Sequence, residues 1–325
     1  MNKVIGIGNA LVDVIIKLRD EKLLNDFSLP KGSMQLVDNK TALKIESETK
    51  GSETIMASGG SAANTIHGLA KLGIETGFIG KIGHDNHGDF FRNDIVSAGI
   101  KQYISHGNDS TGRAITLVSP DSERTFATFL GSAIELNASD IDGIPFSNYS
   151  VLHVEGYLVQ NQKLVETALK IAKLNGLKTS LDLASYNVVE ANKEFLQNTI
   201  QNHVDIVFAN EDEAFALTGK NPEEAAEAIS LICNIAVVKT GSSGSIIQKG
   251  KEQSKIGVID VQCIDTTGAG DLYAAGFLYG LSKNLHVSKC GKIGALLAGK
   301  VIEYLGAKIP ASGWAEIKKL KDLIA

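Results

Sequence analysis

The sequence predicts an α/β fold: a doubly wound, mainly parallel sheet with helices on both faces, and a small additional β-sheet. Short apolar runs alternate with longer segments whose apolar residues recur every three or four positions, which is typical of strand–helix–strand units. Residues 11–55 and 107–130 break this alternation. They contain period-two segments flanked by polar turn residues, which indicates a separate, mixed sheet.

The elements follow this pattern along the chain. The expected strands of the main sheet are 4–8, 75–80, 151–156, 178–183, 204–210 and 235–241. The expected helices are 62–72, 86–98, 161–174, 211–218, 222–232, 270–282 and 288–305. We interpret residues 1–325 as a single domain in which 11–55 and 107–130 form a lid, with a helical insertion near 38–50, and the remainder is the α/β core.

Composition excludes several classes of function. The formal net charge is -5 and no dense basic run occurs, so a nucleic-acid partner is not expected. No run of 18 apolar residues and no signal-peptide pattern is present, which argues against a membrane and favours a cytoplasmic location. The three cysteines are scattered and form no zinc-binding pair, as in proteins of a reducing compartment.

The most informative segment is Asp265-Thr-Thr-Gly-Ala-Gly-Asp271, which leads directly into an apolar helix. Its small residues let the backbone approach an anion, and the helix start adds unpaired N–H groups and a positive dipole end. An acid beside bound phosphate is useful as a base that takes the proton of an attacking hydroxyl. Asp271 is therefore our candidate general base, the alternative being an ordinary helix-capping Asp.

A second segment, Ser58-Gly-Gly-Ser-Ala-Ala-Asn64, also leads into a helix. Paired glycines let the backbone approach a ligand, and the Asn64 amide can both donate to and accept from sugar hydroxyls. We interpret the segment as a polyol site, although a GGS turn alone is often only a turn.

Together the two segments resemble the paired signatures of the ribokinase-like (PfkB) carbohydrate kinases, and the resemblance covers essentially the whole chain. Further matches occur in order: Asn9 and Asp13 in the first strand region, Gly83-x-Asp85-x-x-Gly88, Asn210-Glu-Asp-Glu213, Lys239-Thr-Gly-Ser-Ser-Gly244, and Gly306-Ala307 with Pro310. The resemblance implies a kinase that moves the γ-phosphate of ATP to a hydroxymethyl group of a small sugar or nucleoside.

The resemblance also implies the roles of individual residues. The acceptor's hydroxyls would be held by Asn9, Asp13, Gly59, Gly60 and Asn64. Asp271 would take the proton, and the amides of Gly268, Ala269 and Gly270 would stabilise the transferring phosphoryl group. Mg²⁺ would be held by Asn210 and Glu213, mainly through water, with Glu213 as a plain helix-start acid the alternative. The nucleotide would contact Lys239, Thr240, Gly241, Gly244 and Ala298. Activation by a monovalent cation near Asp265 and Gly306 stays open.

The acceptor is less well specified. Arg124-Thr-Phe-Ala-Thr-Phe-Leu resembles the lid strand of adenosine kinases and their bacterial relatives, with Arg124 reaching phosphate, and Phe126 and Thr128 would present one face to a base. Simple lid packing for Phe126 and a solvated edge charge for Arg124 are the alternatives. The best candidate reaction is adenosine to AMP. A sugar kinase of the fructose or ribose type, or a silent nucleoside-binding protein, are the rivals, and a monomer and a homodimer both stay open.

Overall fold

The computed structural model describes residues 2–121 and 123–324, and its larger sheet has the predicted architecture. The spatial order of its nine strands in the described part of the chain is β14 (Glu252–Ile256), β13 (Ser245–Lys249), β12 (Ile235–Lys239), β11 (Ile206–Asn210), β10 (Lys178–Asp182), β9 (Val151–Glu155), β1 (Val4–Ile7), β5 (Thr76–Ile82) and β6 (Lys101–His106). The seven strands from β12 to β6 are parallel, and β13 and β14 extend the sheet as an antiparallel hairpin.

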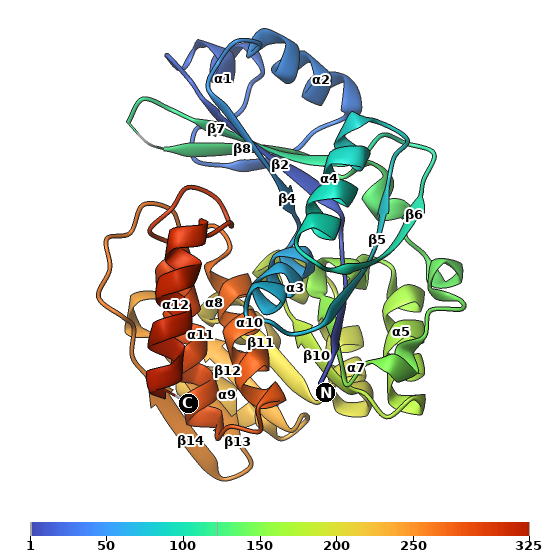
Figure 1. Cartoon of the computed structure of the whole chain (residues 1–325), viewed down its shortest axis with the longest axis vertical. Helices are drawn as coiled ribbons and strands as arrows, with labels where there is room; N and C mark the ends of the chain where they lie inside the picture. The colour runs from blue at the N-terminus through green and yellow to red at the C-terminus, as the bar shows by residue number, and fades with distance from the viewer. Residues whose placement is uncertain (1, 122, 325) are drawn as a thin grey trace.

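Helices cover both faces of this sheet (Figure 1). On one face lie α3 (Ser61–Lys71), α4 (Asn86–Ser97), α10 (Ala269–Ser282), α11 (Val287–Val301) and α12 (Ala311–Ile324). On the other lie α5 (Gln162–Leu174), α6 (Tyr186–Ala191), α7 (Lys193–His203), α8 (Glu211–Thr218) and α9 (Pro222–Ser230). Short 3₁₀ helices are η1 (Gly131–Glu135), η2 (Ala138–Ile141), η3 (Phe146–Asn148), η4 (Gly156–Gln160) and η5 (Gly241–Ser243).

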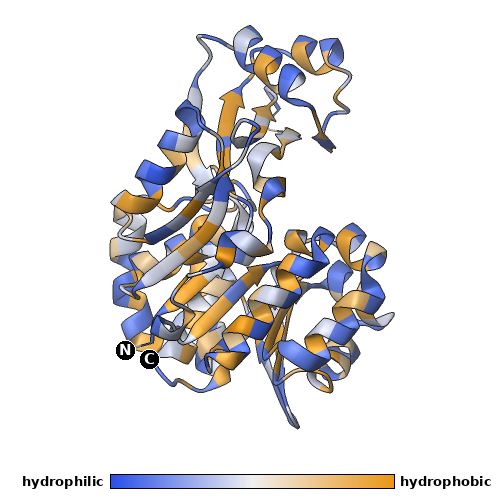
Figure 2. Ribbon diagram, turned by 90° about the vertical axis from the view of Figure 1, so that its right-hand side faces the viewer, coloured by the Kyte–Doolittle hydropathy of each residue, from blue (hydrophilic) through white to orange (hydrophobic). Residues whose placement is uncertain are grey.

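Alternation along the strands explains this double covering. Val4 packs with the α3, α10 and α11 side, whereas Ile5 and Ile7 pack with the α5 and α7 side, because successive strand residues point to opposite faces. Figure 2 shows the resulting apolar strands inside more polar helices. In the described part of the chain, no helix is both long and apolar enough to span a membrane.

The smaller sheet stands at one end of the molecule (Figure 1). Its strand order is β3 (Met34–Leu36), β8 (Arg124–Phe129), β7 (Gly112–Val118), β2 (Leu11–Lys17) and β4 (Thr54–Gly59). One face packs on α1 (Lys22–Asp26) and α2 (Asn39–Glu48), with buried Ile45 of α2 and buried Ile115 and Phe129 of the sheet in the same core. The predicted helical insertion is thus α2, and it covers the outer face.

One predicted helix end is wrong. The expected helix 288–305 ends at Val301, because the carbonyl of Ile302 accepts the N–H groups of Ile264 (2.7 Å) and Asp265 (3.1 Å) and leaves the helical path. This pairing joins the end of α11 to the segment that precedes α10, and so helps to fix the anion turn.

Candidate functional site

The candidate site lies at the carboxyl ends of the parallel strands, where such sheets bind ligands. The last residues of β9, β10, β11 and β12 and the second residue after β1 are polar: Glu155, Asp182, Asn210, Lys239 and Asn9. The sheet register brings these side chains to one edge, and the start of α10 faces the same edge with Asp271.

Asp271 is the third residue of α10, so it is not the helix cap; that position belongs to Gly268, whose φ is 77°. Glycine is required there because a Cβ would also lie 2.5 Å from the Cβ of Ala307. The Ala269 N–H donates to the carbonyl of Thr266 (3.1 Å), whereas we expected this N–H to face the anion. Among the described residues we find no partner for the amides of Gly268 and Gly270.

The Asp271 carboxylate is held by the start of α3. Ser61 Oγ donates to Oδ1 (2.7 Å) and Asn64 Nδ2 donates to Oδ2 (3.0 Å). Burial raises the pKa of Asp271, while these two donors oppose the rise. The Asn64 amide therefore holds the Asp271 carboxylate through its Nδ2. Its buried Oδ1 has no partner among the described residues and is available to accept a hydrogen bond from a ligand.

Asp13, on β2, faces the same region from the smaller sheet. Its carboxylate lies against Gly59, where a Cβ would come within 2.1 Å of Oδ1, so a side chain at 59 would displace it. Gly60 has a φ of 99° and a Cβ there would lie 2.0 Å from the carbonyl of Asn9. Both glycines of the motif are thus required by close approach.

Asn9 does not project freely toward an acceptor. Its Nδ2 donates to Oε1 of Glu155 (2.7 Å), and Oε2 of Glu155 accepts the N–H of Ala62 (3.0 Å). Burial raises the pKa of Glu155 to about 7. Asn9 and Glu155 therefore fix the glycine turn, and Glu155 was missed because a single acid at the end of an apolar run carries little signal.

Arg124 joins the smaller sheet to the loop that precedes α10. Its guanidinium pairs with Asp265 Oδ1 (2.9 Å) and donates to the carbonyl of Ile264. Asp265 is buried and also accepts the N–H groups of Thr267 (2.8 Å) and Gly306 (2.7 Å). Arg124 is therefore not a solvated edge charge, and it contacts the loop that carries the anion turn.

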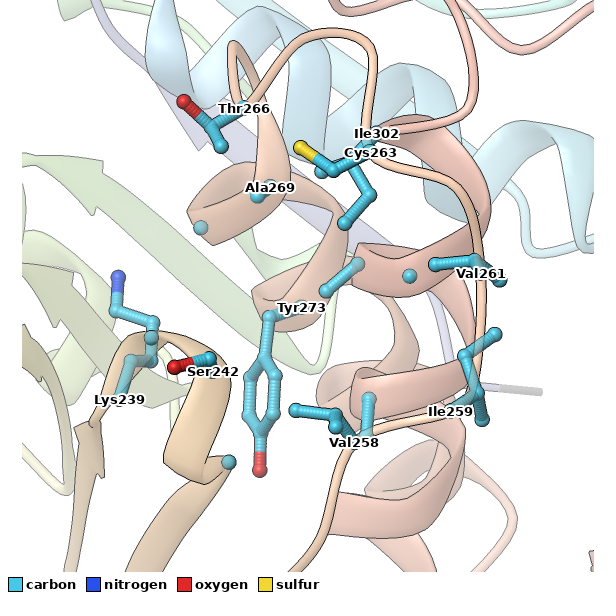
Figure 3. A pocket seen from close by; sticks show the side chains of 16 residues that line it. Lys239, Ser242, Val258, Ile259, Val261, Cys263, Thr266, Ala269, Tyr273 and Ile302 are labelled. Atoms are coloured by element: carbon cyan, nitrogen blue, oxygen red, sulfur yellow. The ribbon is translucent and has the colours of Figure 1, made fainter.

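Two cavities meet at the start of α10. The first, about 440 Å³, is mainly apolar, and Val258, Ile259 and Val261 line it across from Lys239 (Figure 3). Ala298 and Ile302 line it as well. The second, about 490 Å³, is more polar than the first and is lined by Ser61, Asp182, Asn210, Glu213 and Asp271. Their shared wall consists of Lys239, Gly241, Thr266, Ala269 and Gly270. A ligand with an apolar ring and a chain of phosphates could occupy both.

Lys239 is the cation of the shared wall. Its Nζ donates to Asp182 Oδ2 (2.9 Å) and would lie 3.0 Å from a Cβ at Gly270. Its ammonium thus faces the start of α10, although the sequence placed it only at a nucleotide edge. Gly244 of the same loop lies in the apolar cavity, whereas Thr240 bonds to the Gly244 carbonyl (2.8 Å) and does not line either cavity.

Asn210 and Glu213 form a reciprocal capping box at α8. The Asn210 side chain accepts from the Glu213 N–H (2.8 Å), and Glu213 accepts from both the N–H and the Nδ2 of Asn210 (2.8 Å each). Glu213 is thus an acid in the first turn of α8, and its role toward Mg²⁺ stays a prediction. Burial and then the nearby Asp182 raise its pKa to about 7. No preformed cluster of three metal-binding side chains occurs in the described residues.

The inner face of the smaller sheet carries a group of apolar side chains. The register places Phe126 beside Met34, and Thr128 beside Leu36, on the face that carries Asp13. Met34 and Leu36 are 54% and 66% exposed, whereas Phe126 is half-buried. Phe126 thus borders exposed apolar side chains and does not belong to the packed outer core.

The segment after β9 places one ring in the site. Tyr157 lines the polar cavity, while Leu158 is buried in the core. The 3₁₀ turn η4 thus places the Tyr157 ring at the cavity wall and the adjacent Leu158 in the core.

Comparisons with known proteins agree with this geometry. A family model described as pfkB family carbohydrate kinase matches residues 31–313. A 5-dehydro-2-deoxygluconokinase from Lacticaseibacillus casei is 30% identical over 267 residues, or 77% of this chain and 81% of that protein. Two crystal structures match over the full length. A probable sugar kinase from Rhizobium etli has a TM-score of 0.88 and 34% identity, covering 99% of both chains. The adenosine kinase from Sinorhizobium meliloti has a TM-score of 0.87 and 33% identity, covering 100% of this chain and 99% of the other.

Proposed function

The chain belongs to the pfkB family of carbohydrate kinases and is a sugar or nucleoside kinase, and we propose that its acceptor is a nucleoside, with the phosphorylation of adenosine to AMP as the first candidate reaction. The observation that carries this proposal is the group of apolar side chains on the inner face of the smaller sheet. Exposed Met34 and Leu36, with Phe126, lie on the same face as Asp13. A nucleoside matches this arrangement because it joins an apolar base to a polar ribose.

Asp271 is the proposed base. It would take the proton of the acceptor's hydroxymethyl oxygen as that oxygen attacks the γ-phosphate of ATP, and burial, which raises its pKa, makes it a stronger base than an exposed carboxylate. Ser61 and Asn64 orient its two oxygens. The amides of Gly268 and Gly270, together with Lys239, would stabilise charge on the transferring phosphoryl group.

The two cavities support a consistent placement of ATP. The apolar cavity would hold the base beside Ala298, and the triphosphate would cross the shared wall at Lys239 toward Asp271. Asp182 and Glu213 provide carboxylate oxygens, the ligands that Mg²⁺ prefers, and bound Mg²⁺ would neutralise phosphate charge. Since the side chains of Asn210 and Glu213 are hydrogen-bonded to each other, they would bind the metal through water.

The lid proposed for 11–55 and 107–130 would bring Asp13 and the apolar side chains of the inner face down on the acceptor. Arg124 would act at the same closure, because its contact with Asp265 and Ile264 already joins this sheet to the anion turn. Closure would exclude water from the phosphoryl group during transfer.

A kinase of free sugars is the second candidate, favoured by the names of the Lacticaseibacillus casei relative and the Rhizobium etli structure. The test is ADP release from MgATP with adenosine, inosine, guanosine, ribose, fructose or fructose 6-phosphate. We expect turnover on adenosine that falls by about 10²–10⁴-fold in Asp271→Asn. Preference for a free sugar would overturn the nucleoside assignment, and silence across the panel would favour a binding protein.

A further inference from the structure

Lys308 was not recognised from the sequence, yet the loop after α11 that carries it is held between the anion turn and the smaller sheet. The N–H of Gly306 donates to Asp265 Oδ2 (2.7 Å), and Ala307 packs so closely on Gly268 that only glycine fits there. A Cβ at Gly306 would lie 2.8 Å from Ile15 of β2. The backbone of Lys308 therefore follows directly after a segment held between the anion turn and the smaller sheet.

The ammonium of Lys308 is enclosed and unpaired. Its Nζ is buried and has no hydrogen-bond partner among residues 2–121 and 123–324. A buried cation without a partner is strongly unfavourable, so its presence indicates that the positive charge has a function. Three carboxylates act on it, those of Asp94, Asp13 and Asp271, but none is in ion-pair contact with it in the described structure.

Two of these three carboxylates already have donors. Asp94 Oδ2 accepts the N–H (3.2 Å) and Oγ (2.5 Å) of Ser58, and Asp271 accepts from the side chains at the start of α3. Asp13 is different, because its carboxylate accepts no hydrogen bond from the described residues and lies against Gly59 on the acceptor side of β2. Asp13 is thus the carboxylate whose negative charge is left for Lys308 to balance.

We propose that Lys308 is a positioning residue of the acceptor site, whose ammonium favours the charged form of Asp13, which accepts hydrogen bonds from two neighbouring hydroxyls of an uncharged acceptor. The inference rests on the proposed function, since it requires a polyol acceptor. Neutral hydroxyls match the site better than a phosphate or carboxylate would, because the carboxylates of Asp13, Asp94 and Asp271 would repel a second anion.

The electrostatics agree in direction. Burial raises the pKa of Asp13 to about 7; Lys308 lowers it, whereas Asp271 and Asp265 raise it further. Burial lowers the pKa of Lys308 to about 8, while Asp94, Asp13 and Asp271 raise it and Lys71 lowers it. Nearby His67 is neutral, since burial and then Lys308 and Lys71 lower its pKa to about 2. Removal of Lys308 would therefore raise the pKa of Asp13 further and favour its protonated form.

The test measures kcat, the acceptor KM and the ATP KM of the whole enzyme between pH 6 and 9, with adenosine and fructose as acceptors. In Lys308→Met we expect an acceptor KM about tenfold higher at pH 7 and an acid limb of kcat/KM moved up by about one pH unit. The ATP KM stays unchanged, and Lys308→Arg restores both values. Lys71→Met, which removes the other nearby lysine, is the control.

A double-mutant cycle separates this role from simple support of the fold. If Lys308 acts through Asp13, Lys308→Met added to Asp13→Asn raises the acceptor KM no further. Equal losses for acceptor and ATP with an unmoved acid limb, or additive effects with Asp13→Asn, would overturn the inference alone. A wild-type enzyme that turns over no acceptor of the panel would instead overturn the proposed function, and the inference with it.

Discussion

Gly59→Ala is a small change with a large expected effect on the acceptor. An added Cβ would lie 2.1 Å from Oδ1 and 2.4 Å from Cγ of Asp13, far inside van der Waals contact, so the carboxylate must move by more than 1 Å. The backbone of Gly59 is not in the left-handed region, so alanine adds no conformational strain of its own. Loss of a hydrogen bond to a charged group costs about 1.5–3 kcal/mol, and about 1.4 kcal/mol is tenfold in affinity. The acceptor affinity should therefore fall about 10- to 150-fold.

Calorimetric titration with the acceptor and with MgATP, each binding measured separately, checks this expectation. The MgATP Kd should stay unchanged, because neither Gly59 nor Asp13 lines the apolar cavity. Gly257→Ala is the matched control, since a Cβ there meets nothing within 4 Å and its φ is ordinary. An acceptor Kd equal to that of the wild type in a folded Gly59→Ala protein would refute the assignment of Asp13 to the acceptor.

The remaining predictions concern the phosphate side and stability. Lys239→Met should lower kcat by about 100-fold and raise the ATP KM in steady-state assays. It should also lower the free energy of unfolding by about 3 kcal/mol, because it leaves buried Asp182 unpaired. A variant with wild-type kcat would contradict the phosphate role of Lys239. Because burial raises the pKa of Glu155 from 4.5 to about 7, the folded state binds this proton more tightly than the unfolded state. Its contribution to stability is full below pH 4.5 and is lost as the pH rises through about 7. Urea unfolding of Glu155→Gln should show a weaker loss of stability across this window than the wild type, and an identical pH dependence would exclude Glu155 as the cause.

The parts of the site that sequence could predict are those where a local residue pattern has a single structural solution. Strand ends were predictable because apolar runs end at Asn9, Asp182, Asn210 and Lys239, and the carboxyl ends of parallel strands share one edge. All six predicted strands are present, but β6 and the β13–β14 hairpin were not expected. The β6 sequence KQYISH is largely exposed, because it forms a sheet edge, and therefore lacks an apolar run.

Long-range contacts were the part that sequence could not supply. Glu155 and Lys308 act on residues roughly 100 to 300 positions away, and no spacing rule joins such partners. The pairing of Arg124 with Asp265 depends on how the smaller sheet meets the anion turn. The role of Ser61 became visible only when α3 and α10 were seen to share the Asp271 carboxylate.

The most direct test of the account is a paired measurement on Asp271→Asn: ADP release from MgATP with adenosine, and the Kd for adenosine by calorimetry. We predict that turnover falls by about 10²–10⁴-fold, as for loss of a general base, while adenosine still binds with a Kd near that of the wild type, because the amide keeps the shape of the side chain. Turnover close to the wild-type rate in this variant would contradict the central role of Asp271.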